Sequence, residues 1–170
     1  MLKINLGCGQ NYLKGYVNVD IDERVNPDVI ADVTIVPWIW AKPNSADEIR
    51  MNNLAEHLRP IIEVVQECHR ALKNGGILWI KVPFLKTVLK TDGNLEELLG
   101  SIKEFIKSVE DCCSDPTHVG LKFTTRTFDY FDMEHSRWQK FGKSYGIPKF
   151  RRINQRIKDR FLIVELEAIK

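Results

Sequence analysis

The chain has 170 residues, of which 44% are hydrophobic and 28% are charged, and its formal net charge is +2 at pH 7. This length predicts one domain, residues 1–170, with a hydrophobic core, and the composition is that of an ordinary globular protein. No run approaches the ~20 apolar residues of a transmembrane helix, and the first residues lack a signal-peptide pattern, so we expect a cytoplasmic protein.

Two short apolar runs open the chain. Residues 2–6 are followed by a Gly-Cys-Gly triplet at 7–9, and residues 16–19 are followed by Asp20. The pattern predicts a buried strand, a glycine turn and a second strand that ends in a carboxylate. Glycine permits a positive φ and a close approach of a ligand, and a carboxylate in this place can accept two hydrogen bonds from a ribose diol. Together the runs indicate half of a nucleoside-binding crevice.

The spacing of this first unit argues against a dinucleotide fold. The fingerprint G-x-G-x-x-G needs a third glycine where this chain has Tyr12, and Asp20 comes too early for the usual acidic residue. A crossover helix with its loops needs about 10–12 residues, so the residues between Gly9 and Tyr16 have room for one helical turn at most.

Two further strands and a polar loop are predicted next. Residues 29–33 predict a short strand that carries Asp32 at its tip, and residues 47–51 predict a fourth strand. The loop after this fourth strand contains Asn52, Asn53, Glu56 and His57. Because ligands of open α/β sheets lie at the carboxyl ends of strands, this loop is in the right place for chemistry.

A helix and a buried strand are predicted after the loop. Apolar residues recur at helical spacing over residues 61–72, with Pro60 suited to the first turn and Asn74-Gly75 suited to a left-handed cap. His69 lies off the apolar stripe, and we expect it to be exposed. The apolar run at 77–82 is typical of a central parallel strand.

Residues 85–110 form an insertion with a second helical stripe. Its apolar residues are Leu95, Leu98, Leu99, Ile102, Phe105, Ile106 and Val109. We expect a helix that packs over the active-site side as a lid, and a contact in a homodimer is the alternative. The chain closes with two strands, 149–158 and 161–169, which are predicted to be antiparallel and joined by a tight turn near Lys158-Asp159.

The distribution of cysteine and of basic residues leaves two questions open. Cys8, Cys68, Cys112 and Cys113 have no C-x-x-C spacing, so no metal site is predicted and reduced structural thiols are expected, with a redox or metal role of Cys112-Cys113 as the alternative.

From Arg137 to Arg160 there are nine basic residues and one acid. This stretch is interpreted either as a solvated face or as a patch for an anionic substrate or surface.

Taken together, five segments in order resemble class I S-adenosylmethionine-dependent methyltransferases, most closely a compact group that reads LGCG, NVD, LEHL, LKxGG and DPTH. The segments are Leu6-Gly7-Cys8-Gly9, Asn18-Val19-Asp20, Leu54-Ala55-Glu56-His57-Leu58, Leu72-Lys73-Asn74-Gly75-Gly76 and Asp115-Pro116-Thr117-His118. The resemblance implies the α/β class and a Rossmann-like methyltransferase sheet. That sheet is mostly parallel, has an antiparallel C-terminal edge strand and is flanked by helices.

The resemblance also implies S-adenosylmethionine as the cofactor and a set of residues that bind it. These residues are Leu6, Gly7, Gly9, Asp20, Ile21, Asp32, Val33 and Asn53. In such enzymes the residue matching Asp20 binds the ribose, and those matching Asp32 and Val33 meet the adenine through a side chain and a backbone N–H. The alternative for Asp32 is that it caps the next turn of its own backbone.

Three residues are candidates for the general base that methyl transfer to a protonated nucleophile needs: His118, His57 and Glu56. Histidine titrates near neutral pH, and His118 stands in the D-P-T-H segment that borders the substrate pocket in the family. The expected function is methyl transfer to a small or anionic acceptor, such as a sugar, a nucleotide or a glycan precursor.

Two alternatives of a different kind stay open. A nucleic-acid acceptor is compatible with the basic stretch at 137–160, which contains Trp138, Phe141, Tyr145 and Phe150. Proteins that bind single strands combine aromatic side chains that stack on bases with basic side chains that contact phosphates. The short connection after Gly9 favours a non-catalytic nucleoside-binding module on a degenerate methyltransferase frame. No motif specifies the acceptor atom.

Overall fold

The computed structural model describes residues 1–84, 94–113 and 123–170, without the side chains of 111–113. Its strands are β1 Lys3–Leu6, β2 Val17–Asp20, β3 Val29–Ile30, β4 Ala46–Asn52, β5 Leu72–Pro83, β6 Phe150–Lys158 and β7 Phe161–Ala168. Its two long helices are α1 Ile61–Ala71 and α2 Leu95–Cys113, and four short helical segments are Glu23–Val25, Ala55–His57, Thr127–Tyr130 and Trp138–Gly142.

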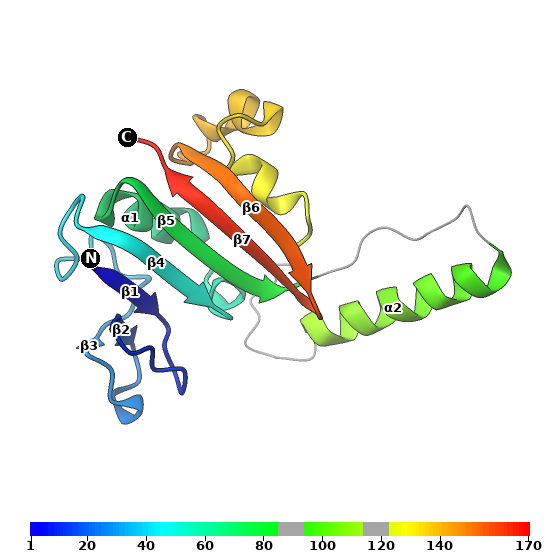
Figure 1. Cartoon of the computed structure of the whole chain (residues 1–170), viewed down its shortest axis with the longest axis horizontal. Coiled ribbons are helices and arrows are strands. Elements are labelled where there is room, and N and C mark those ends of the chain that lie inside the picture. Colours follow the sequence, from blue (N-terminus) through cyan, green and yellow to red (C-terminus); the bar gives the residue numbers. More distant parts are fainter. Residues whose placement is uncertain (85–93, 114–122) are drawn as a thin grey trace.

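The strands form one sheet in the order β3-β2-β1-β4-β5-β7-β6 (Figure 1). The neighbours from β3 to β5 are parallel, and β7 runs antiparallel to both β5 and β6. The predicted α/β class, the mostly parallel sheet and the reversed C-terminal strand are therefore confirmed. The predicted hairpin turn is also present, with Asp159 in a left-handed conformation at φ 55°.

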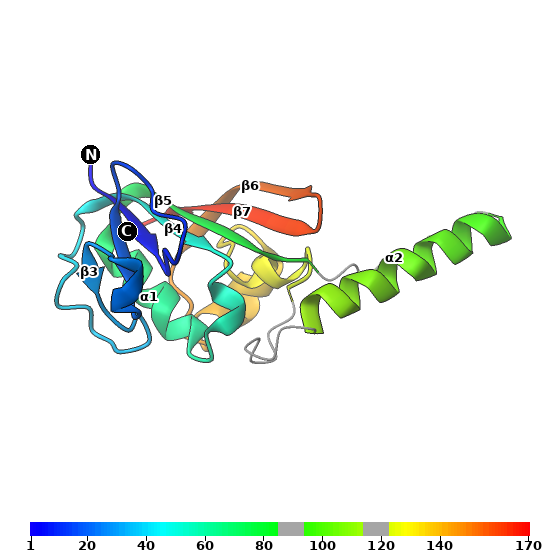
Figure 2. The same ribbon diagram turned by 90° about the horizontal axis from the view of Figure 1, so that it is seen from below.

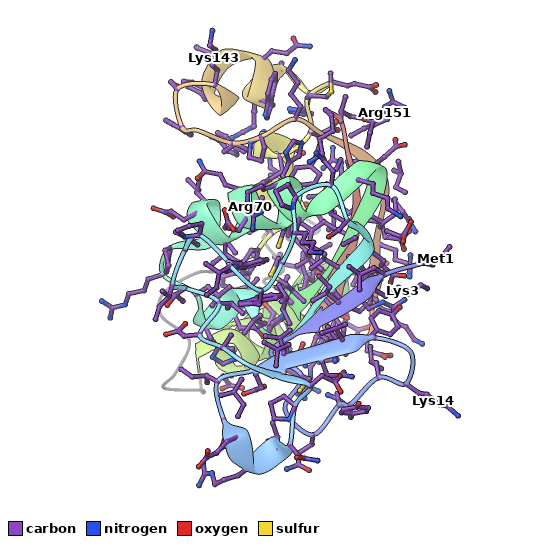
Figure 3. The ribbon with its side chains drawn as sticks, turned by 90° about the vertical axis from the view of Figure 1, so that its left-hand side faces the viewer. Met1, Lys3, Lys14, Arg70, Lys143 and Arg151 are labelled. Carbon is purple, nitrogen blue, oxygen red and sulfur yellow. The ribbon has the colours of Figure 1, made fainter. Side chains whose placement is uncertain are left out.

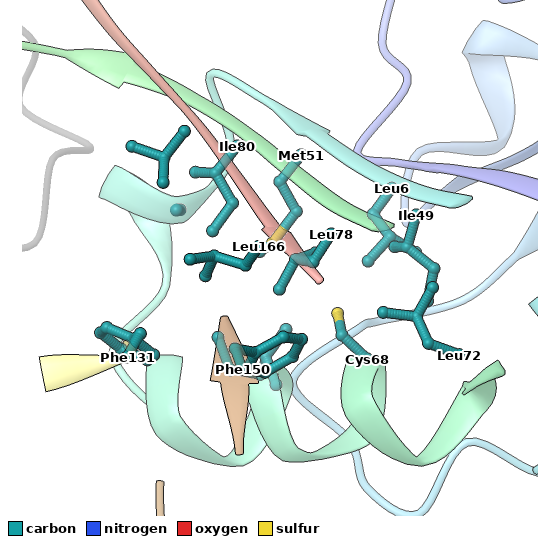
Figure 4. Close-up of a cluster of buried hydrophobic side chains, with 14 of the residues drawn as sticks. Leu6, Ile49, Met51, Cys68, Leu72, Leu78, Ile80, Phe131, Phe150 and Leu166 are labelled. Atoms are coloured by element: carbon teal, nitrogen blue, oxygen red, sulfur yellow. The ribbon is translucent and has the colours of Figure 1, made fainter. Parts of the chain in front are cut away.

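The core lies between α1 and one face of the sheet. Figure 4 shows Leu6, Ile49 and Leu78 directed from neighbouring strands toward Cys68 of α1, and all four side chains are buried. The segment that contains Thr127–Tyr130 and Trp138–Gly142 lies on the same side of the sheet (Figure 2). Period-2 alternation explains this arrangement, because every second residue of each strand points to the helix side.

The opposite face of the sheet carries charged side chains. Lys3 is on this side, away from α1 (Figure 3), and its Nζ lies 3.0 Å from Glu48 Oε2. Arg50 forms an ion pair with the same carboxylate and lies over the Trp79 ring, 5.0 Å from the centroid. The strands thus alternate between core residues and ion-paired surface residues.

Helix α1 ends earlier than the sequence predicts. The expected left-handed cap at Asn74-Gly75 is wrong, because the helix stops at Ala71 and Leu72 already begins β5. The carbonyls of Arg70 and Ala71 accept hydrogen bonds from the N–H groups of Asn44 and Ser45 at 2.9 and 2.8 Å. A left-handed cap is unnecessary because a neighbouring loop already satisfies these last carbonyls.

His69 is half-buried, which corrects the expectation that it is exposed. Its ring meets Phe150 edge-on at 5.0 Å between centroids, and its Nε2 lies 3.0 Å from the carbonyl oxygen of Ile169. Burial lowers the pKa of this imidazole, so the neutral form is favoured. The residue joins α1 to the last strand pair.

Helix α2 is present in the predicted insertion, but it does not cover the carboxyl ends of β1 and β2. Figure 1 shows it extending away from the sheet, with its amino-terminal end far from the sheet, and the residues Glu104, Lys107 and Ser108 lie across a hollow from the β6–β7 turn. Asn94 caps the helix by accepting a hydrogen bond from the Glu97 N–H at 3.0 Å. A role as a lid stays a prediction.

Two buried asparagines replace the helix that usually follows β1. Asn5 donates to Asn18 Oδ1 and to the Asn11 carbonyl, both at 2.9 Å. Asn18 also accepts from the Leu13 N–H at 2.8 Å and donates to the Leu13 and Tyr16 carbonyls at 3.1 Å. The loop between β1 and β2 is thereby held against the sheet by side chains rather than by a helix.

Replacing Asn18 by alanine is expected to destabilise the fold by about 3 kcal/mol, because the buried Asn5 side chain and several part-buried backbone groups of the loop lose their partner at once. Urea unfolding followed by circular dichroism measures the loss. The matched control is Asn154→Ala, which removes one hydrogen bond to Glu165 at the edge of the sheet and should cost less than about 1 kcal/mol. Equal losses for the two variants would contradict the role assigned to Asn18.

A second polar contact fixes the loop between β3 and β4 to α1. Glu67 is 9% exposed and accepts a hydrogen bond from the Trp38 N–H at 2.8 Å. Arg70 donates to the same carboxylate at 2.8 Å and to the Ala41 carbonyl at 2.9 Å. Burial acts to raise the pKa of Glu67, but the hydrogen bonds from Arg70 and Trp38 outweigh it, and the pKa lies below its ordinary value of 4.5.

Because the pKa of Glu67 is lower in the folded chain than in the unfolded chain, the ionised group stabilises the fold above pH ~4.5, and this contribution is lost as the pH falls further. Glu67→Gln should therefore cost more stability at pH 7 than at about pH 3. Urea midpoints at the two pH values test this, with the exposed Glu63→Gln on the same helix as the control. A cost that is the same at both pH values would refute it.

Candidate functional site

The glycine turn after β1 is bound to the end of β2 through Asp20. Gly7 and Gly9 have positive φ values of 59° and 46°. The Gly9 N–H donates to Asp20 Oδ2 at 2.7 Å, and the Asp22 N–H donates to Asp20 Oδ1 at 2.9 Å. A carboxylate has about four acceptor positions, so both oxygens can accept further hydrogen bonds from a ligand while they hold the turn.

A cavity of about 220 Å³ opens beside this turn, at the carboxyl ends of β1 and β2. It is lined by Gly7, Asp20, Ile21, Ala31, Asp32, Val33, Leu54 and Leu58. Five of the eight residues predicted to bind a cofactor are among them. Its volume is below the ~300–1,000 Å³ typical of small-molecule pockets, so it has room for only part of a ligand of that size.

The remaining predicted cofactor residues lie next to the cavity but do not line it. Leu6 is completely buried beneath the turn, and Gly9 faces open space, because a Cβ built on it would meet nothing within 4 Å. Asn53 is exposed, has a positive φ of 53°, and donates its N–H to the Lys81 carbonyl at 2.9 Å. It therefore links the ends of β4 and β5.

Leu54 and Leu58 are site residues that the sequence interpretation missed. They flank the short helical segment Ala55–His57, and their side chains form an apolar wall of the cavity. A Cβ on Gly7 would come within 2.7 Å of Leu54 Cδ1, so the Leu54 side chain occupies space that only glycine at position 7 leaves open. The spacing of four residues between the two leucines is the signal in the sequence that indicates a shared face.

Asp32 caps the turn that follows β3, as one of the two interpretations expected. Its Oδ1 accepts hydrogen bonds from the Thr34 N–H at 2.8 Å and from the Thr34 hydroxyl at 2.7 Å. Both bonds use Oδ1, so capping is compatible with a further contact through Oδ2. The predicted contact of Asp32 with an adenine stays a prediction.

Val33 is positioned by a buried tryptophan. Trp38 Nε1 donates to the Val33 carbonyl at 2.9 Å, and the Trp38 N–H in turn donates to Glu67 of α1. Trp38 is 2% exposed and stacks on Trp40, with 5.0 Å between ring centroids. Trp38 is therefore a core residue, and its contact with Glu67 fixes one wall of the cavity to α1.

The three candidate bases have different outcomes. Glu56 is 2% exposed, and His57 beside it is half-buried; both lie in the turn that carries Leu54 and Leu58. Their location after β4 agrees with the predicted loop, although Glu56 is far more buried than a loop residue usually is. His118 and the rest of the D-P-T-H segment lie outside the described residues.

Among the described residues, two hollows of more than twice this volume lie away from the cavity. One of about 580 Å³ is on the sheet face opposite α1 and is lined by charged residues such as Lys73 and Asp47, which pair with each other at 2.8 Å. The other, of about 800 Å³, lies between α2 and the β6–β7 turn and includes Phe84 and Phe161. Neither contains the glycine turn or the strand-end carboxylates of the predicted nucleoside site.

Several basic residues of the 137–160 stretch are ion-paired within the chain. Arg152 pairs with Asp129 at 2.9 Å, and Arg156 pairs with Glu165 at 2.9 Å. Arg151 pairs with Glu134 at 3.0 Å. Phe150 is completely buried, so it is not a stacking platform. These contacts favour the interpretation of this stretch as a solvated face.

The comparisons with known proteins establish the fold. No protein-family model matches the sequence, and no curated protein is similar to it. Among solved structures, the chain is similar to one from the complex between the Haloferax volcanii Trm112 methyltransferase activator and a methyltransferase. The TM-score is 0.60 at 13% identity, and the alignment covers 99% of this chain and 83% of the other.

Two further structures are similar along nearly the whole chain. An S-adenosylmethionine-dependent methyltransferase of Thermotoga maritima gives a TM-score of 0.58 at 16% identity, covering 98% of this chain and 82% of the other. One of Methanococcus maripaludis gives 0.53 at 17% identity, covering 99% and 78%. The chain therefore has the Rossmann-like methyltransferase fold that the sequence predicts.

Alanine at the two glycines of the turn is expected to have unequal effects. Gly7→Ala adds a left-handed alanine, which costs about 1–2 kcal/mol, and also displaces Leu54. Gly9→Ala meets open space, so only the backbone cost remains. Thermal unfolding should therefore rank Gly7→Ala as the less stable variant, and the reverse order would contradict the geometry of the turn.

Proposed function

We propose that the chain is an S-adenosylmethionine-dependent methyltransferase. The observation that supports this most directly is the cavity at the carboxyl ends of β1 and β2, where Gly7, Asp20 and Asp32 lie together. In an open α/β sheet this is the place where nucleoside ligands bind. The similarity of the fold to that of methyltransferases supports the same proposal.

The residues of the cavity fit the adenosine portion of this cofactor. Asp20 would accept hydrogen bonds from the ribose hydroxyls through the oxygens that also hold the glycine turn. Asp32 Oδ2 would accept from the adenine amine, the Val33 N–H would meet a ring nitrogen, and Leu54 and Leu58 would contact the ring. When bound, the cofactor supplies an electrophilic methyl group on its sulfonium.

The chain's own task would be to orient the acceptor and, where needed, to remove its proton. Glu56 and His57 follow Leu54 directly, so a base from this turn would stand beside the cofactor cavity. Such a base contributes about 10²–10⁴-fold to the rate of a step that needs proton removal. We propose His118, His57 and Glu56 as candidates and a small or anionic molecule as the acceptor.

The alternatives receive less support. The internal ion pairs of Arg151, Arg152 and Arg156 reduce the charge that a nucleic-acid strand would meet. The short connection after β1 is stabilised by the buried asparagine network, so the absence of a helix there does not by itself indicate a degenerate, non-catalytic frame.

Calorimetric titration with S-adenosylhomocysteine tests the proposal. The wild-type chain should bind this product, and Asp20→Asn should weaken binding at least about tenfold, because the ribose then loses a charged acceptor. The matched control is Asp47→Asn at the amino end of β4, which should bind as the wild type does.

The same variants are compared by urea unfolding, so that a loss of binding is separated from a loss of folding. Absence of binding to the folded wild-type chain would contradict the proposed function. Binding that is insensitive to Asp20→Asn would place the ligand outside the proposed cavity.

A further inference from the structure

Helix α2 presents an apolar stripe to solvent. Leu95 is 71% exposed, Leu99 is 49% exposed and Ile106 is 50% exposed, and Ile102 between them is partly exposed. Residues spaced by four, three and four positions lie on one face of a helix. An exposed contiguous apolar stripe of this kind marks an interaction surface.

The spacing of this stripe is that of a helix pair. The sequence Leu95, Leu99, Ile102, Ile106 alternates steps of four and three, which is the pattern of the core positions in a coiled coil. Val109 continues it. A helix with this pattern buries its stripe by packing against a second helix with the same pattern.

The charged residues beside the stripe can pair with those of a second copy only if the two helices are antiparallel. Glu96 and Lys103 lie on the same flank, seven residues apart. In an antiparallel pair the two equivalent flanks face each other, so Glu96 of one copy meets Lys103 of the other, twice. In a parallel pair this flank would instead face Leu98 and Phe105.

We propose that α2 forms an antiparallel two-helix contact with α2 of a second copy of this chain. Leu95 packs beside Ile106 of the second copy, and Leu99 packs beside Ile102 of the second copy. A two-fold axis relates the copies, and every contact occurs twice, as in an isologous dimer. The Glu96 and Lys103 side chains form two ion pairs across the interface.

The position of α2 in the molecule allows this contact. The amino-terminal end of the helix lies away from the sheet and its carboxyl-terminal end lies beside it (Figure 1). An antiparallel pair centred between Leu99 and Ile102 therefore places the two sheets at opposite ends of the helix pair. A parallel pair would bring both sheets to the same end, where they would compete for space.

Sedimentation velocity of the full chain under reducing conditions measures the mass as concentration rises from about 10 µM to about 1 mM, because a short interface gives a weak dimer. We expect the mass to rise from the 19.7 kDa of one chain toward twice that value. Leu99→Glu should keep the chain monomeric throughout. A wild-type chain that stays monomeric, or a Leu99→Glu variant that still dimerises, would overturn the proposal.

Charge reversal tests whether the two helices are antiparallel and whether the partner is α2 of a second copy of this chain. Lys103→Glu and Glu96→Lys each replace two attractive contacts by repulsive ones, so each should weaken dimerisation roughly tenfold. The double variant Glu96→Lys/Lys103→Glu should recover the wild-type affinity. A mixture of the two single variants should also associate, as a heterodimer.

The matched control is Glu97→Lys, which makes the same change of charge one position away from the interface and should leave dimerisation unchanged. Circular dichroism confirms that each variant is folded. If neither the double variant nor the mixture recovers association, the helices do not pair antiparallel with each other. The stripe would then serve a different contact, and the proposal would be wrong.

Discussion

The position of the cavity depends on two buried asparagines beneath the loop between β1 and β2, which is too short for a crossover helix. Asn5 and Asn18 satisfy the backbone of the loop between β1 and β2, which in a parallel sheet is normally carried by a crossover helix. A buried polar group that lacks a partner costs more than a satisfied one gains. The network therefore has to be complete, and its completeness fixes where the glycine turn and Asp20 lie.

Asp20 connects this scaffold to the proposed chemistry. The carboxylate accepts one backbone N–H on each oxygen, so it is oriented before any ligand arrives. A preorganised acceptor loses little conformational entropy on binding. On the opposite wall, the contact from Glu67 to Trp38 and from Trp38 to Val33 orients the second half of the cavity. Two separate polar contacts thus hold the two walls of one small cavity.

Local sequence could predict the strands, the glycine turn and the carboxylates at strand ends, because each depends on a short-range rule. Alternating apolar residues show which face of a strand is buried. A carboxylate at the end of a parallel strand lies at the edge of the sheet where ligands bind in open α/β folds. Rules of this range failed where distant segments meet. Asn44 and Ser45, which are distant from α1 in the sequence but adjacent to it in space, cap its last turn, and the helix ends before the expected glycine cap.

The sequence by itself determined the α/β class, the order of the elements and five residues of the cavity. The tertiary structure decided that Leu54 and Leu58 form a wall, that Glu56 is buried and that His69 packs on Phe150. It also decided the direction of α2, because an apolar stripe predicts a helix but does not specify what covers it. Periodicity reports on one element at a time, whereas a site and an interface depend on which elements meet.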